Sequence, residues 1–291
     1  MEKVRNARMF EYEYVLRSAK NSEFFLAAKE LITSSSDKEV LKLLNDENPI
    51  VRSYAAYFVQ DRNIKADWYN YLAGEIEDYE KVLYAKYDVS GQYPAGDFII
   101  QTLIEKKLSK DEQKKLRVEI IKKQSKFDYA KKILCSDEKS DDLYKATKKW
   151  AQKGNETAIY ALAKYQKPED LALIETLKTK KPGLFFRACE YNRIDKHKPY
   201  LKEYMISIMP GSYYSRDWIY FYKLIADYHD DFSKEIFDMA FSNKVNKDVQ
   251  KYHIKIIYYV IKDNTDGFYD KYIKIINKKY DFKDEFVYEL Q

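Results

Sequence analysis

The chain has 291 residues and a formal net charge of +5. Its apolar content of 45% is enough to bury a core, which excludes an intrinsically disordered chain. With only 7 glycines and 6 prolines, the composition disfavours a loop-rich β protein and favours long helices. No window approaches about 18 uncharged apolar residues, so we expect no membrane-spanning helix.

The N-terminus and the cysteines favour a cytoplasmic setting. Residues 1–8 lack the apolar core of a secretory signal. Cys135 and Cys189 show no paired spacing and lie in helical patterns, so we interpret them as small apolar residues. The 29 tyrosines are expected mainly on half-buried helix faces, because the ring is apolar while the hydroxyl stays hydrated.

The first three elements are predicted to be helices. Residues 1–30 show mixed helical spacing of aromatic side chains. The run Ser34–Asp37 then predicts the cap of a short helix that carries Val40, Leu41 and Leu44. Residues 48–59 carry the clearest local motif: Asn48 caps a helix, Pro49 occupies its first turn, and Val51, Ala55 and Phe58 form an inward stripe.

The segment 48–59 resembles the second helix of a HEAT repeat, including the repeats related to phycobilisome lyases. The Asn-Pro turn, Val51-Arg52 and Ala55-Ala56 carry the resemblance. It persists more weakly through 156–170 and 183–195, where the Val-Arg pair is absent, and after about 210 only the spacing remains. The resemblance implies a solenoid in which the second helices of successive hairpins line the concave face.

Between 60 and 135 the sequence predicts three helices and one long turn. We expect one helix from Trp68 to Lys86, another over 98–107, and a third to about 124 that Ser109 and Glu112 open with a capping box. Residues 88–97 are dense in turn-forming residues. They are interpreted as an inter-repeat loop, or as a hinge that separates 1–87 from 98–291.

The segment 105–132 concentrates positive charge, with eleven basic and five acidic side chains. Such a stripe can neutralise phosphates, and Lys115 and Lys122 are expected on one helix face. The competing interpretation is a solvated helix flank, which is common for runs of charge. The anion or nucleic-acid candidates are Lys106, Lys107, Lys114, Lys115, Lys122 and Lys123.

From residue 141 the sequence repeats with a period of about 28 residues, which is typical of stacked helical hairpins. Asp141-Asp142-Leu143 matches Glu169-Asp170-Leu171 in this register. Lys153-Gly154-Asn155 likewise matches Lys181-Pro182-Gly183 and then Met209-Pro210-Gly211. First helices are predicted to begin near Asp142, Asp170, Lys198, Asp231 and Asp266, and second helices near Asn155, Gly183, Tyr213 and Asn246.

Residues 213–222 hold six aromatic side chains in ten positions, more than one inward stripe can bury. Trp218, Phe221, Tyr222 and Ile225 account for a core face. Tyr213, Arg216 and Tyr220 are then predicted to point outward, and exposed Tyr and Arg together are typical of interaction hot spots.

No motif predicts catalysis, a metal or a cofactor. The histidines His197, His229 and His253 share no ligand spacing, and no nucleophile elbow or phosphate-binding glycine loop occurs. HEAT-like alkylpurine DNA glycosylases need a Trp with an Asp one helical turn later. Here Tyr222 follows Trp218 at that distance, so the glycosylase reading lacks its site.

We therefore predict an all-α fold, a right-handed α-solenoid of stacked helical hairpins that spans 1–291 as one domain. The predicted function is non-catalytic binding of another protein, in its sharper form a dedicated bacterial partner such as a toxin, as for an immunity protein. The resemblance places these residues near the binding face: Arg52, Tyr160, Arg187, Tyr191, Arg216 and Lys251. Nucleic-acid binding through 105–132 is the alternative, with the glycosylase third.

Overall fold

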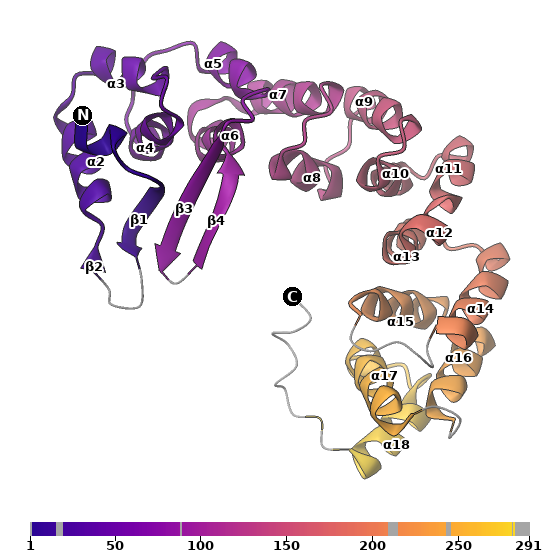
Figure 1. The fold of residues 1–291 in the computed structure, drawn as a ribbon. Coiled ribbons are helices and arrows are strands. Elements are labelled where there is room, and N and C mark those ends of the chain that lie inside the picture. Colours follow the sequence, from indigo (N-terminus) through magenta and orange to yellow (C-terminus); the bar gives the residue numbers. More distant parts are fainter. Residues whose placement is uncertain are drawn as a thin grey trace. The chain divides into compact units, whose positions relative to one another are not determined.

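The computed structural model describes residues 2–15, 20–87, 89–208, 215–242, 246–280 and 282. The chain divides between Trp150 and Ala151 into two compact units, which are described separately below. Most of the described residues are helical, as predicted (Figure 1). None of the helices in these residues is long and apolar enough to cross a membrane.

The N-terminal unit contains helices and one small sheet. Its helices are α1 Glu2–Arg5, α2 Glu23–Ser34, α3 Asp37–Leu44, α4 Pro49–Val59, α5 Trp68–Glu75, α6 Ala95–Lys107, α7 Lys110–Lys122, α8 Asp128–Cys135 and α9 Asp141–Gln152. The strands are β1 Phe10–Val15, β2 Lys20–Asn21, β3 Lys81–Tyr87 and β4 Val89–Pro94. They form a sheet in the order β2-β1-β3-β4, in which only β1 and β3 are parallel.

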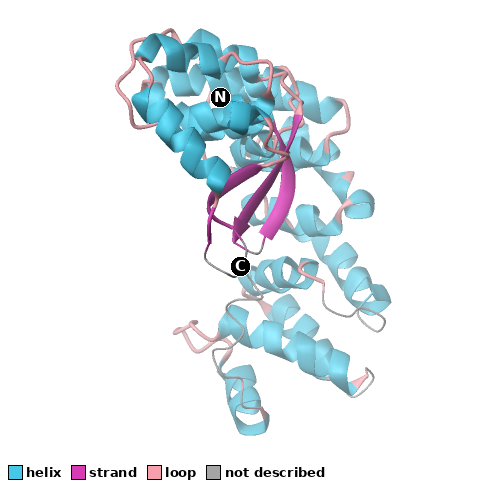
Figure 2. Ribbon diagram, turned by 60° about the vertical axis from the view of Figure 1, so that its left-hand side comes forward, coloured by secondary structure: helices cyan, strands magenta, loops and turns pink. Residues whose placement is uncertain are grey.

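The small sheet is an unpredicted addition to a mainly helical fold, and it corrects the predicted helix over 1–30 (Figure 2). In β1, Phe10 and Tyr12 alternate with Glu11 and Glu13, which is the two-residue period of a half-buried strand. Phe10 is fully buried and its ring lies 4.4 Å from that of Tyr54 on α4. Burial of this aromatic face against the helices therefore favours strand over helix.

The predicted helix over 68–86 is also wrong in its second half. Helix α5 ends at Glu75, and Lys81–Tyr87 form β3 instead. The predicted loop or hinge at 88–97 contains β4 and the first turn of α6, while Asp88 lies outside the described residues. Gly91 is needed in this hairpin because a Cβ atom there would meet the Tyr84 ring at 2.8 Å.

The predicted helix caps are confirmed. The Ser36 side chain accepts from the Glu39 amide in a full capping box, and Asn48 accepts from the amides of Ile50 and Val51. Ser109 and Glu112 form the predicted capping box at the start of α7. Each cap satisfies amide groups that a helix start leaves without partners, so these boundaries are encoded locally.

The C-terminal unit consists of helices in the described residues. Its α-helices are α10 Glu156–Leu162, α11 Leu171–Glu175, α12 Leu177–Lys180, α13 Pro182–Tyr191, α14 Lys198–Ile208, α15 Asp217–Tyr228, α16 Asp231–Phe241, α17 Lys247–Ile261 and α18 Asp270–Lys279. Three short 3-10 segments accompany them: Ala163–Tyr165, Pro168–Asp170 and Asp195–His197. The predicted starts of first and second helices are confirmed to within a few residues at all described positions.

The second helices of the hairpins form one row. α10 packs on α13, α13 on α15, and α15 on α17. α12, α14 and α16 accompany this row, with α12 against α13 and α16 against both α15 and α17 (Figure 1). The predicted core face of α15 is confirmed, because Trp218, Phe221, Tyr222 and Ile225 are at most 1% exposed.

Candidate functional site

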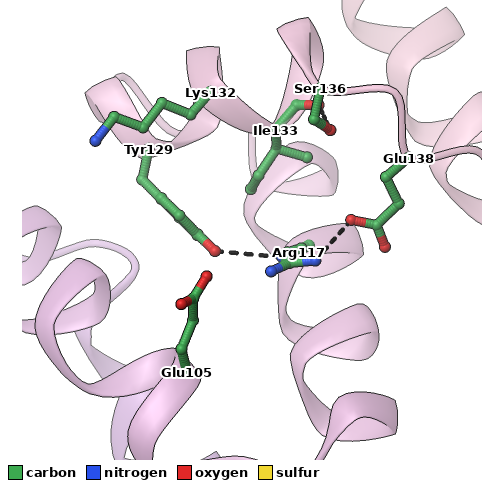
Figure 3. Close-up of a pocket in the computed structure, with 7 residues that line it drawn as sticks. All are labelled: Glu105, Arg117, Tyr129, Lys132, Ile133, Ser136 and Glu138. Atoms are coloured by element: carbon green, nitrogen blue, oxygen red, sulfur yellow. Dashed lines mark hydrogen bonds and ion pairs between the residues drawn. The ribbon is translucent and has the colours of Figure 1, made fainter.

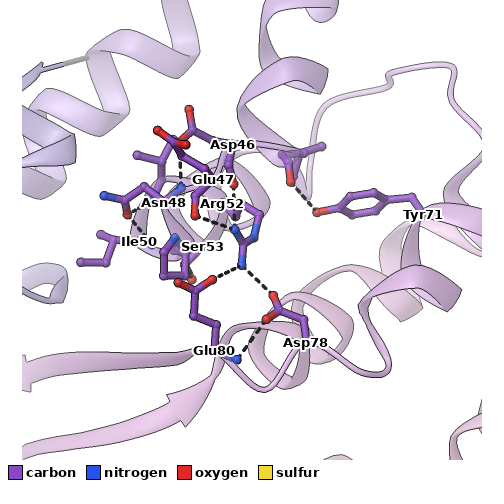
Figure 4. Close-up of polar contacts among 12 residues, drawn as sticks. Asp46, Glu47, Asn48, Ile50, Arg52, Ser53, Tyr71, Asp78 and Glu80 are labelled. Atoms are coloured by element: carbon purple, nitrogen blue, oxygen red, sulfur yellow. Dashed lines mark hydrogen bonds and ion pairs between the residues drawn. The ribbon is translucent and has the colours of Figure 1, made fainter.

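Arg52, a predicted partner-binding residue, is instead held inside the N-terminal unit (Figure 4). Its guanidinium donates to the Asp46 carbonyl at 2.7 Å, to the Asp78 carboxylate at 2.8 Å and to Glu80 at 3.0 Å. Its side chain is only 12% exposed. The three acceptors join the start of α4 to the turn before β3, so Arg52 has a structural role in this unit.

Glu75 lies beside this cluster with an unusual carboxyl group. Burial, together with the nearby Asp78 carboxylate, raises the pKa of Glu75 to about 7, although Arg52 opposes the shift. One of its oxygens, Oε2, is buried and has no hydrogen-bond partner in the described chain. The folded state therefore favours the protonated carboxyl, which a neutral amide would mimic.

We expect Glu75→Gln to stabilise the protein at pH 8 and to change little at pH 5. A folded pKa above the unfolded value of 4.5 means that Glu75 lowers stability as pH rises from about 4.5 to 7. Thermal unfolding at both pH values tests this, with an expected gain of about 2–4 °C at pH 8. Glu77→Gln, on the exposed side of the same turn, is the control; an equal gain in both variants would contradict the assignment.

In the C-terminal unit, three predicted partner-binding residues come together in a stack. The Arg187 guanidinium lies 4.6 Å from the ring centroid of Tyr160 and 5.0 Å from that of Tyr220. Tyr160 belongs to α10, Arg187 to α13 and Tyr220 to α15, so the stack joins three successive helices of the row. A guanidinium over aromatic rings is favourable and holds the side chain in one orientation.

The stack is partly accessible. Tyr160 is 5% exposed, whereas Arg187 and Tyr220 are half-buried. Beside it on the same two helices, the Lys223 ammonium pairs with the Glu190 carboxylate at 3.2 Å. The charges of Lys223 and Glu190 therefore compensate each other, and Arg187 provides the positive charge of the stack.

The other predicted partner-binding residues are not in this stack. Arg216 and Lys251 are exposed, at the start of α15 and on α17. Tyr191 is half-buried at the end of α13, where its carbonyl accepts a hydrogen bond from Gln166 at 2.8 Å. Tyr213 lies outside the described residues.

Half of the predicted anion-binding lysines are engaged within the N-terminal unit. Lys106 pairs with Asp61 at 3.1 Å and Lys123 with Glu77 at 3.2 Å. Lys107 donates to the Arg62 carbonyl, and its ammonium lies 5.2 Å from the centre of the Trp68 ring. Burial lowers the pKa of Lys107. These contacts replace the continuous lysine stripe expected from the sequence.

Lys114, Lys115 and Lys122 are exposed and form no ion pair with the described residues. Lys122, at the end of α7, lines a pocket of about 380 Å³ together with four residues of α9, namely Asp142, Lys145, Ala146 and Lys149. The sequence placed Lys115 and Lys122 on one helix face but gave no sign that α9 adds two further lysines.

Two further pockets of the N-terminal unit escaped the sequence analysis. The first, of about 360 Å³, is lined by Tyr12, Glu13, Tyr14, Tyr57, Lys86 and Tyr87. The alternation along β1 is the signal that would have grouped Tyr12 and Tyr14. The second, of about 270 Å³, surrounds Arg117, which donates to Glu138 at 2.8 Å and to the Tyr129 hydroxyl at 3.2 Å (Figure 3).

The chain matches no family model, no curated protein and no solved structure in comparisons with known proteins. Within the described ranges, no three His, Cys, Asp or Glu side chains gather closely enough to hold a metal ion.

Proposed function

We propose that the protein is a non-catalytic scaffold that binds another protein along the row of α10, α13, α15 and α17. The observation that carries this proposal is the stack in which Arg187 lies against the rings of both Tyr160 and Tyr220. Tyr and Arg are the residue types most enriched among the side chains that dominate binding energy in protein interfaces.

Preorganisation adds to this argument. An arginine on an open surface loses rotamer freedom when a partner fixes it, at a cost of about 0.5–1.5 kcal/mol. Stacking between two rings orders Arg187 before any partner arrives, so less of that cost remains at binding. Tyrosine rings provide a large contact area with few rotatable bonds, which also keeps the entropy cost of binding small.

We further infer that the row belongs to a right-handed HEAT-like α-solenoid. The support is the period of about 28 residues and the packing of each second helix on the next one. The dedicated-partner form, as in an immunity protein that binds a bacterial toxin, stays a prediction. Capture of one stoichiometric protein is the result that would establish it.

Nucleic-acid binding remains the alternative, with Lys114, Lys115 and Lys122 as its available cations. The engagement of Lys106, Lys107 and Lys123 within the chain weakens it. The glycosylase reading gains no support, because Trp68, Trp150 and Trp218 are each at most 9% exposed and a lesion must stack on an accessible ring.

We expect Tyr220→Ala to reduce partner binding by about tenfold or more, because it removes one wall of the stack. Tagged capture from lysate of the source organism, with and without nuclease, identifies the partner, and its dissociation constant is then measured for both proteins. Tyr220→Phe, which keeps the ring, is the matched control and should bind as the wild type does.

A partner that is lost on nuclease treatment, or that dissociates steeply with salt, would favour nucleic acid instead. An unchanged dissociation constant for Tyr220→Ala would remove the stack from the interface.

A further inference from the structure

We propose that Arg187 binds a carboxylate of the partner protein, either an Asp or Glu side chain or a chain end, through the N–H edge of its guanidinium. This inference rests on the proposed function and names the partner chemistry of the same site. It follows from which surfaces of the Arg187 side chain are used within the chain and which are not.

Two aromatic rings lie against the guanidinium. The guanidinium carbon is 4.6 Å from the ring centroid of Tyr160 and 5.0 Å from that of Tyr220. These ring contacts supply no oxygen acceptor for the N–H groups of the guanidinium. The N–H groups are therefore available to a ligand, and they present the fork of donors that matches a carboxylate.

Among the half-buried arginines, Arg187 is unusual because its N–H groups donate no hydrogen bond to a described residue. Arg52, Arg62 and Arg117 each donate hydrogen bonds to carbonyl or carboxylate oxygens of the chain. Arg62, for example, reaches the Ile32 carbonyl at 2.8 Å and the Asp37 carboxylate at 2.6 Å. Arg187 is also half-buried, yet it forms no hydrogen bond or ion pair with any of the described residues.

The neighbouring charges favour one acidic group over a polyanion. Lys223, which lies on α15 three residues after Tyr220, is already paired with Glu190. A nucleic-acid backbone presents successive phosphates and is held by several cations along its path. A single ordered arginine flanked by tyrosines matches instead one acidic anchor set in an apolar contact, as in a protein interface.

The test is a titration of the full chain labelled with ¹⁵N only at arginine, followed through the side-chain Nε–H signals. The probes are N-acetyl-glutamate methylamide, its glutamine counterpart and inorganic phosphate. Arg187→Lys assigns the Arg187 signal. Arg216 is exposed and has no ion pair in the described chain, so it is the internal reference for a guanidinium that is not stacked.

We expect the Arg187 signal to move with the glutamate probe at a concentration several-fold lower than Arg216 requires, and to move little with the glutamine probe. In Tyr220→Leu this advantage over Arg216 should disappear, since the guanidinium loses one wall. Tyr220→Phe should retain it. Equal responses to glutamate and glutamine would overturn the proposal, and a response to phosphate at tenfold lower concentration than to glutamate would replace carboxylate with phosphate.

The experiments distinguish failure of the carboxylate site from failure of the proposed protein binding. If Tyr220→Ala weakens partner capture while the glutamate probe leaves the Arg187 signal unmoved, protein binding holds and the carboxylate chemistry is wrong. If the glutamate probe moves the signal but Tyr220→Ala binds the partner normally, the carboxylate site exists and the partner lies elsewhere.

Discussion

Replacing Gly183 with alanine should destabilise the protein by about 2–3 kcal/mol. Gly183 is buried in the first turn of α13, and a Cβ atom there would lie 1.9 Å from Oδ1 and 2.5 Å from Cγ of Asp217. Asp217, at the start of α15, accepts a hydrogen bond from the Gly183 amide. Alanine therefore forces the half-buried carboxylate out of its position and separates it from the helix end that it caps.

Two comparisons isolate this cause. Gly74→Ala, in the exposed last turn of α5, meets no atom within 4 Å and should instead stabilise by up to about 1 kcal/mol, since alanine favours helix. The double variant Gly183→Ala with Asp217→Ala should lose less free energy of unfolding than the sum of the losses in the two single variants. Denaturant unfolding of the wild type, the three single variants and the double variant gives the free energy of unfolding of each protein. Strict additivity would mean that the contact with Asp217 is not the source of the loss.

Acid should destabilise the C-terminal unit through His253. This side chain is fully buried on α17, its Nδ1 lies 2.9 Å from the Tyr222 hydroxyl, and its ring centroid lies 4.5 Å from that of Trp218. Its Nε2 has no hydrogen-bond partner among the described residues. Burial lowers the pKa of His253 from 6.5 to about 4, because a charged imidazolium is poorly solvated in this apolar setting.

The direction of this pH dependence follows from proton binding in the folded and unfolded states. Between pH 6.5 and 4 the unfolded chain binds a proton at His253 and the folded chain does not, so stability falls as pH falls through this window. The full loss is on the order of 3 kcal/mol, at about 1.4 kcal/mol for each tenfold change in the equilibrium constant. Above pH 6.5 this group contributes no further pH dependence.

The double variant His253→Phe with Tyr222→Phe tests this assignment. It removes both hydrogen-bonding partners, so we expect a small change in stability at pH 8 and a shallower decline between pH 6.5 and 4. Tyr222→Phe alone keeps the histidine and should keep the decline. Unfolding by urea at several pH values gives the slopes, and identical slopes in the double variant and the wild type would contradict the role of His253.

The helix starts were predictable because their signals are local. Asn48 with Pro49, and Ser109 with Glu112, satisfy the amides of their own first turn, and the structure places caps at both. The sheet was not predicted, although the alternation along Phe10–Val15 is visible in the sequence. β1 joins the sheet through parallel pairing with β3, more than sixty residues away along the chain, and no local pattern specifies that pairing.

For the candidate site, the sequence specified the residue types and most of the helices that carry them. The resemblance selected Arg52, Tyr160 and Arg187, the aromatic run selected Tyr220, and the concentration of positive charge selected Lys107. The packing of the helices then separated these candidates. It brings Tyr160, Arg187 and Tyr220 together across α10, α13 and α15, and it commits Arg52 to Asp78 and Lys107 to the Arg62 carbonyl. The reason is that a side chain's availability depends on which oxygens and rings the packing of distant helices brings within reach, and sequence spacing fixes only neighbours along one helix.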